Sequence, residues 1–117
     1  MNKLKIETTI KTKSEKTAVN TMGTIESGII SYKENNNTYM YLDINRNELI
    51  RENDEINMKY SFKEKETTKG TIFIKELNKN IKLDIKTIKI EKTDYKYKVE
   101  YIIEEETFIY EITYREV

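Results

Sequence analysis

Apolar side chains alternate with polar or charged ones along most of this chain. Leu4, Ile6 and Ile10 are separated by Lys, Glu and Thr, and the same spacing recurs in later segments: residues 56–62, 72–74, 81–85, 95–101 and 108–114. A period of two places alternate side chains on one face of a β-strand, and helical templates match these segments poorly. The pattern therefore predicts an all-β chain without a helix longer than one or two turns.

Short polar breaks between the segments predict tight turns, because Asn and Asp tolerate the left-handed backbone conformations that turns need. The breaks lie at residues 35–37, 52–54, 78–80, 92–93 and 104–106. Strands joined in sequence order by turns at this spacing are typical of a meander, which forms a barrel or a sandwich.

Four of the turns also predict which residues face one another across a hairpin. Aromatic and β-branched side chains that meet in this way stabilise a sheet by ~0.2–1 kcal/mol per pair. The expected pairs are Tyr101 with Phe108, Val99 with Tyr110, Tyr97 with Ile112 and Tyr95 with Tyr114 in the last hairpin; Tyr32 with Tyr39 and Ile30 with Tyr41; Ile74 with Leu83 and Ile72 with Ile85; and Ile90 with Tyr95 and Ile88 with Tyr97.

The inward phase changes within one long segment. Its apolar positions are odd-numbered up to Ile85 and even-numbered from Ile88 onward. A β-bulge at Lys86-Thr87 produces such a change and bends the strand, as closure of a barrel requires. Two separate short strands are the alternative interpretation.

No predicted helix is available to cover the apolar face of this sheet. Closing the sheet on itself buries that face and removes the strand edges. Eight or nine segments are visible, and eight strands enclose an interior just wide enough for side chains or one small ligand. We therefore expect one domain, residues 1–117, formed by an antiparallel meander that closes into an eight-stranded barrel.

Charge and reactive side chains exclude several functions. The 21 basic and 21 acidic side chains cancel, which leaves no overall field to attract DNA or a membrane. The chain has no His and no Cys, so it has no Ser–His–Asp triad, no Cys nucleophile and none of the usual zinc ligands. We expect a cytoplasmic protein that is not an enzyme and needs no cofactor or metal, although a pair of carboxylates could still perform acid–base chemistry.

One polar segment has the spacing of a calcium-binding loop. Asp43, Asn45, Asn47 and Asp54 occupy positions one, three, five and twelve of such a loop. Position six is Glu48 rather than the glycine that the turn needs, and no helices are predicted on either side. A polar connection between β-strands is the favoured interpretation.

The nine tyrosines are the main candidates for a binding site. The residues expected to line a pocket, in the interior of the barrel or at its mouth, are Tyr39, Tyr41, Tyr60, Tyr97, Tyr101, Tyr110 and Arg51. Such a lining suits a small apolar or aromatic ligand. Tyrosines that fill the core and carry their hydroxyls to the rim give the same pattern, so both interpretations stay open.

Charge is unevenly distributed in the second half of the chain. Residues 75–98 contain eight Lys and four acidic residues, whereas residues 100–117 contain six Glu and one Arg. A basic stripe beside tyrosines is a candidate RNA-binding surface, but Lys on exposed strands also prevents association between edges, and the terminal Glu residues could cancel the stripe. Phe73, Ile102 and Ile109 have the outward phase and are candidates for a protein-binding patch.

The order of motifs resembles one known family. Residues 22–43 (MGTIESGIISYKENNNTYMYLD) combine a strand, Gly28, an aromatic hairpin and an acidic end. There follow Leu49-Ile50-Arg51, a strand ending at Phe62, Thr68-x-Gly70 before Ile72-Phe73-Ile74, and a Tyr-rich terminal hairpin. This arrangement resembles the YwiB-like family of small uncharacterised bacterial proteins. The resemblance implies a calycin-like β-barrel, related in shape to lipocalins, and no known activity.

Two functional hypotheses follow from the sequence. The first is a barrel that binds a small apolar ligand inside or at one end, and the second is an interaction module that binds a protein or RNA through an outer face or a strand edge. A hydrolase with two converging acids is a third. The first predicts inward tyrosines around open space, and the second predicts a filled barrel with a patch outside it.

Overall fold

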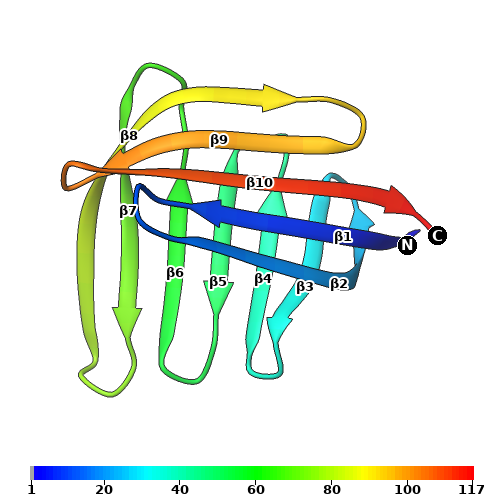
Figure 1. The fold of residues 1–117 in the computed structure, drawn as a ribbon. Coiled ribbons are helices and arrows are strands. Elements are labelled where there is room, and N and C mark those ends of the chain that lie inside the picture. The colour runs from blue at the N-terminus through cyan, green and yellow to red at the C-terminus, as the bar shows by residue number, and fades with distance from the viewer. Residues whose placement is uncertain (1) are drawn as a thin grey trace.

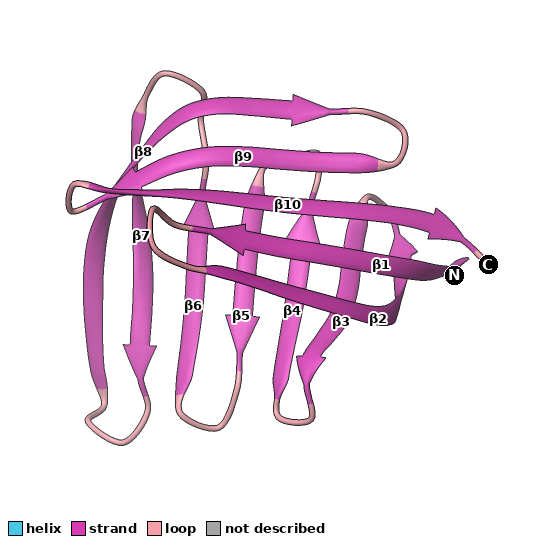
Figure 2. Cartoon of the chain, viewed as in Figure 1, coloured by secondary structure: helices cyan, strands magenta, loops and turns pink. Residues whose placement is uncertain are grey.

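The chain forms a closed antiparallel β-barrel in the computed structural model, which describes residues 2–117. Each strand pairs with its neighbour in sequence, and β1 pairs with β10 to close the barrel. No helix occurs within these residues (Figure 2), and hence none that is long and apolar enough to cross a membrane. The strands are β1 (Asn2–Lys11), β2 (Lys16–Glu26), β3 (Ile29–Asn35), β4 (Thr38–Asp43), β5 (Glu48–Glu52), β6 (Ile56–Ser61), β7 (Thr67–Ile74), β8 (Lys79–Lys92), β9 (Lys96–Ile103) and β10 (Glu106–Glu116).

The strands form two sets that cross at a steep angle (Figure 1). One set contains β3 to β7, and the other contains β1, β2, β9 and β10. β8 belongs to both, because it bends from the first set into the second where its pairing with β9 shifts register between Thr87 and Lys89. The bulge interpretation of this segment is confirmed, one or two residues later than predicted, and β8 is a single strand of 14 residues. A bulge bends a strand in this way because it inserts one extra residue into one strand of the pair.

The core lies between the two crossed sets. Its side chains are buried aliphatic and aromatic groups from seven strands and one turn. They are Leu4, Ile6, Ile30, Tyr32, Met40, Leu42, Leu49, Phe62, Ile85, Tyr97, Val99, Tyr101, Tyr110 and Ile112. Thr8, Thr38 and Thr87 are the buried polar side chains among the described residues. Inward residues of each strand alternate with exposed ones, as period two predicts.

The all-β meander and its closure are confirmed, but the expected number of strands is wrong. The barrel has ten strands rather than eight. The hydrophobic pattern is weakest in β2, whose sequence KTAVNTMGTIE contains mostly small and polar residues, and β5 has only five residues. Alternation alone reveals such strands poorly, because they contribute few fully buried side chains.

The predicted register is confirmed for the last hairpin and wrong for the other three. Tyr101 lies opposite Phe108, as expected. In the hairpins around β8, the observed partner of Ile81 is Ile72, and Val99 rather than Tyr95 is the partner of Ile90. In both hairpins, each residue pairs with a partner four positions away from the predicted one. An even shift leaves the paired side chains on their expected faces, so alternation could not detect it. Ile88, which was expected to face inward, lies at the register shift of β8 and is exposed.

The error in the β3–β4 hairpin has a larger effect. Tyr32 lies opposite Met40 rather than Tyr39, because the register shifts between Lys33 and Asn35. A shift of one residue moves each side chain of a strand to the other face. Tyr39 and Tyr41 therefore point outward, in contradiction to the prediction.

Candidate functional site

Three of the predicted lining tyrosines lie in the core. Tyr97, Tyr101 and Tyr110 are each at most 4% exposed. Burial raises the pKa of each phenol far above its usual value, because an anion loses its hydration there. These side chains are therefore neutral at physiological pH and act through packing and hydrogen bonds.

Aromatic rings fill the space around Tyr101. Its ring stacks on Phe108 at a centroid distance of 5.3 Å, and it lies 4.9 Å from the ring of Phe62. Tyr60 approaches the same ring edge-on at 6.1 Å and is only partly buried. Close contacts of this kind stabilise a core beyond the area they bury. In this part of the barrel the aromatic residues contact one another.

Tyr39 and Tyr41 do not contribute to the interior. Tyr39 is 43% exposed, and the Lys33 ammonium lies 5.2 Å from the centre of its ring. Tyr41 lies with Ile29 and Ile50 in a shallow depression on the outer surface. Phe73, Ile102 and Ile109 have the predicted outward phase, but they lie on three different strands and are partly buried.

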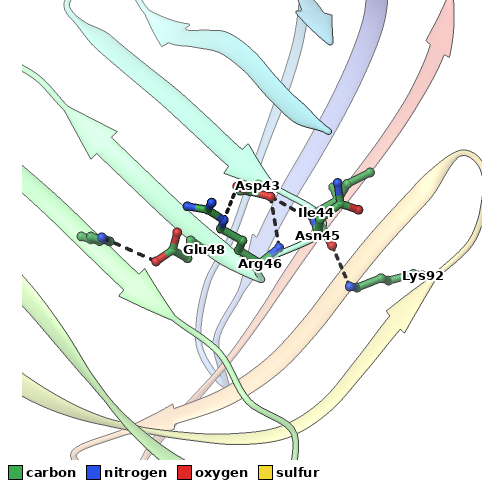
Figure 3. A network of polar contacts seen from close by, with 7 residues as sticks. Asp43, Ile44, Asn45, Arg46, Glu48 and Lys92 are labelled. Carbon is green, nitrogen blue, oxygen red and sulfur yellow. Dashed lines mark hydrogen bonds and ion pairs between the residues drawn. The ribbon is translucent and has the colours of Figure 1, made fainter. Parts of the chain in front are cut away.

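The turn between β4 and β5 contacts β8 and β9 at one end of the barrel (Figure 3). The Lys92 ammonium of β8 donates a hydrogen bond to the Ile44 carbonyl at 2.6 Å. The Tyr97 hydroxyl donates to the side-chain oxygen of Asn47 at 3.2 Å. These contacts hold the turn against the opposite set of strands.

The same turn contains the calcium-like spacing. Asp43 Oδ1 accepts hydrogen bonds from the backbone N–H groups of Asn45 and Arg46, both at 3.1 Å (Figure 3). Asp43 therefore caps a turn between strands, as the favoured interpretation requires. Within residues 2–117, no three acidic side chains lie close enough together to hold a metal ion.

The opposite end is open because the two sets of strands separate there. β2 pairs with β3 only over its last four residues, from Gly23 to Glu26, although it continues back to Lys16 beside β1. β3 in turn continues past Tyr32 to Asn35 without pairing to β2. Figure 1 shows that β3 to β8 extend well beyond β2 on this side. Their inner surface therefore faces no second layer of strands there, among the residues described.

A row of inward side chains crosses this part of the sheet. The paired residues are Tyr32 with Met40, Met40 with Arg51, Arg51 with Met58, Met58 with Ile72, and Ile72 with Ile81. The first two are buried, and the other four are partly exposed. Beside this row, farther from the core, Ile56 pairs with Ile74, and both are partly exposed. The row thus leads from the core to solvent.

We call the partly exposed part of this surface the open-end face. It consists of Glu34, Arg51, Ile56, Met58, Ile72, Ile74 and Ile81. Five of these seven side chains are apolar, and they come from three adjacent strands, β6, β7 and β8. Tyr60 lies between this face and the aromatic contacts of the core, since it packs against the core and remains partly exposed.

The two charges of the open-end face neutralise each other. Arg51 Nε donates to Glu34 Oε2 at 2.9 Å, and the side chains are 34% and 17% exposed. Burial, reinforced by the nearby Glu34 charge, raises the pKa of Tyr32 to about 12, against the smaller lowering effects of its hydrogen bonds and of Arg51. The face therefore presents an apolar surface that ends in one ion pair.

Sequence reasoning found two residues of this region, Arg51 and Tyr60, and missed the rest. Glu34 continues the inward phase of Ile30 and Tyr32, so alternation could have placed it. Alternation predicts that Met58 and Ile72 share the inward face, but it does not predict how far each stays exposed. Only the separation of β2 from β3 leaves them near solvent, and no local pattern reports that separation.

The basic stripe of residues 75–98 lies beside acidic side chains. Lys89 lies opposite Glu100, and Lys98 lies opposite Glu111. Lys89 also forms an ion pair with Glu91 at 3.0 Å. The positive charges of β8 and β9 are thus interleaved with negative ones, which weakens the case for an RNA-binding surface.

The comparisons with known proteins support the fold and give no activity. No protein-family model matches the chain, and no curated protein matches it. A solved structure, that of the ywiB protein from Bacillus subtilis, is similar with a TM-score of 0.65 over 98% of this chain and 90% of that one. The sequence identity is 13%. The chain therefore shares the fold of this bacterial protein.

Proposed function

We propose that the protein is a non-enzymatic barrel that binds a small apolar or aromatic ligand on the open-end face. The observation that carries this proposal is the continuity of Met58, Ile72 and Ile81, which are paired across three strands and partly exposed. In a chain with 36% charged residues, a connected apolar surface at the open end of a barrel is a typical place for a ligand.

The packing of the interior favours the open end over the centre of the barrel. Tyr97 and Tyr110 are at most 1% exposed, and the aromatic side chains around Tyr101 contact one another. A ligand at the open end displaces none of these groups. Tyr60 can offer it an aromatic edge, and Arg51 a polar contact at the border of the face.

We also infer that the chain is a calycin-like member of the YwiB-like family and acts in the cytoplasm. The order of motifs from Gly28 to the terminal hairpin supports the family, and the likeness to the ywiB structure supports the architecture. The balanced charge and the absence of Cys are compatible with the cytoplasm.

A methionine-based titration tests the site directly. Met58 lies on the open-end face, Met22 is 51% exposed on the outer surface, and Met40 is buried. N-phenylnaphthylamine, a neutral fluorescent probe, is added to protein with isotopically labelled methionine methyl groups. We expect a concentration-dependent shift of the Met58 methyl resonance and none at Met22. A shift at Met22 alone, or at neither, would contradict the proposal.

Two neighbouring residues provide matched variants. Ile72 points to the open-end face, and Phe73 points to the opposite face of the same strand. Ile72→Ser should weaken probe binding at least tenfold, whereas Phe73→Ser should leave it within about twofold. Equal effects of the two substitutions would place the probe elsewhere. The far-ultraviolet circular dichroism of both variants checks that the barrel remains folded.

The second candidate function is an interaction module. One observation favours it specifically: residues 16–22 of β2 pair with β1 on one side and with no strand on the other, within residues 2–117. An unpaired edge is a template for another extended chain. This edge runs beside the open-end face, so the two candidate functions meet at one location.

A further inference from the structure

The free edge of β2 presents a defined set of backbone groups. The turn before β2 is closed by a hydrogen bond from the Thr12 N–H to the Glu15 carbonyl. Antiparallel strands alternate between hydrogen-bonded and non-hydrogen-bonded pairs, so Thr17, Val19 and Thr21 exchange hydrogen bonds with β1. The backbone groups of Ala18, Asn20 and Met22 therefore point away from β1, toward the open end.

This edge lacks the charges that usually protect a free strand. Residues 17–25, TAVNTMGTI, contain no charged side chain. By contrast, residues 79–85 of β8, which pair with β7 and not with β9, contain Lys79, Lys82 and Asp84. Charged side chains on an edge strand prevent pairing with other chains. The edge of β8 is protected in this way, and the edge of β2 is not.

We propose that the open end binds an uncharged, extended peptide of another protein, which pairs with β2 as an additional strand. Alternate side chains of this peptide would then contact the open-end face. Strands of a sheet lie about 4.8 Å apart and side chains alternate between its faces. A strand beside β2 would therefore extend the set formed by β1, β2, β9 and β10 over the exposed inner surface of β3 to β8. This inference rests on the proposed function, because it names the class of ligand for the same face.

The shape of the barrel favours a single strand over a second copy of the protein. β3 to β8 project beyond β2 on the side of its free edge (Figure 1). A second barrel that joined its own β2 to this one in a continuous sheet would have to occupy the space of these projecting strands. A single extended segment avoids this conflict.

The charges of the site specify the composition of the peptide. Residues 17–22 of the free edge carry no charge, and Arg51 is already paired with Glu34. A charged side chain that faced inward would lose hydration without gaining a partner. The site therefore favours apolar residues such as Ile or Val at alternate positions of the bound segment, with uncharged residues between them.

Two peptides separate backbone pairing from apolar contact. The first alternates Ile and Ser over seven residues, with one Lys at each end for solubility. The second has the same side chains but carries N-methyl groups on alternate amides. It is made in two versions, methylated on the odd or on the even amides, so that in one of them the amides that face β2 cannot donate hydrogen bonds. We expect the parent peptide to bind and to shift the Met58 methyl resonance. One N-methylated version should bind at least tenfold more weakly, since two or three hydrogen bonds of ~0.5–1.5 kcal/mol each are lost.

A substitution in β2 tests the same edge from the other side. Asn20→Pro removes a donor that faces the free edge and leaves the alternating bonds to β1 in place, a position where edge strands accept proline. It should weaken peptide binding at least tenfold, whereas Asn20→Ala should not. Both variants should still bind N-phenylnaphthylamine, which shows that the face is intact.

The outcomes distinguish this inference from the proposed function. If the fluorescent probe shifts Met58 but the peptide does not bind, or if all N-methylated versions bind as tightly as the parent, the peptide inference is wrong and the proposed function stands. If neither probe nor peptide affects Met58, both are wrong. If the protein alone dimerises in sedimentation experiments and the parent peptide does not dissociate the dimer, a second copy is the true occupant and the inference fails.

Discussion

The hydroxyl of Tyr32 on β3 lies 2.7 Å from the hydroxyl of Tyr110 on β10, and both side chains are buried. The two residues are 78 positions apart in the sequence and come from the two crossed sets of strands. Their hydrogen bond therefore ties the sets together beside the open end. It also satisfies two phenolic groups that would be costly to bury alone.

The strength of this tie can be measured with a double-mutant cycle. Tyr32→Phe leaves the Tyr110 hydroxyl without this partner and should lower the free energy of unfolding by about 1–3 kcal/mol. Tyr110→Phe should cost less, because the Tyr32 hydroxyl can also bond to Thr8. The double variant should cost less than the sum of the two, and urea denaturation provides the three values. Additive effects would show that the two hydroxyls do not interact.

The barrel should lose stability in alkaline solution. Burial, the largest cause, raises the pKa of Tyr32 to about 12 from its usual value of 10.0. Between these values the unfolded chain releases the phenolic proton and the folded chain retains it. The contribution of Tyr32 to stability is therefore complete below pH 10 and is lost as the pH rises toward 12, on the order of 3 kcal/mol in total.

Denaturation at a series of pH values measures this loss, and tyrosinate absorbance reports ionisation. Tyr32→Phe should unfold with a shallower dependence on pH in the same window, although Tyr97, Tyr101 and Tyr110 add to it in the same direction. A stability that rises with pH above about 10 would contradict the assignment of buried, neutral phenols.

The turn between β9 and β10 stores conformational strain that can be removed. Glu104 and Glu105 have φ angles of 49° and 70°, the left-handed values of a two-residue hairpin turn, which Asn-Gly adopts more easily. The double substitution Glu104→Asn with Glu105→Gly should raise the free energy of unfolding by about 1 kcal/mol. The same substitution pair at the exposed residues Glu15 and Lys16, outside this kind of turn, is the control. A loss of stability at the turn would mean that the glutamates make contacts there.

Two glycines inside strands should respond differently to a methyl group. At Gly23 a Cβ would collide with the backbone carbonyl oxygen of Ser31, whereas at Gly70 it would meet the Ile85 Cδ1 at 2.7 Å, the flexible end of a side chain. Gly23→Ala should lower the free energy of unfolding by about 2–3 kcal/mol. Gly70→Ala should cost about 1 kcal/mol or less, since the gain in strand propensity offsets part of the crowding. The reverse order in thermal unfolding would show that β2 and β3 are more loosely paired at Gly23 than the structure indicates.

The last hairpin shows why part of the fold could be read from the sequence. Tyr97, Val99 and Tyr101 alternate with Lys and Glu, and the turn after them is short and polar. A two-residue turn at Glu104-Glu105 places all three opposite apolar partners, and the structure adopts this register. Alternation fixes which side chains face inward, and the position of the turn fixes which residues pair, so local information is enough where both are clear.

The site depended on information that is not local. Tyr39 and Tyr41 follow the alternating pattern as well as Tyr97 does, but one extra residue in β3, between Lys33 and Asn35, moved them to the outer face. A bulge of one residue leaves composition and periodicity almost unchanged. It nevertheless reverses which side chains can reach a ligand.

The sequence by itself determined that this chain is an antiparallel all-β meander, because period two and polar turns act within a few residues. It also excluded catalysis by His or Cys, since neither residue is present. Tertiary structure alone decided that ten strands close the barrel, that β8 bends across a corner, and that β2 leaves β3 at Gly23. The physical reason is that closure balances the geometry of all ten strands together, whereas each local pattern constrains only one strand and its neighbour.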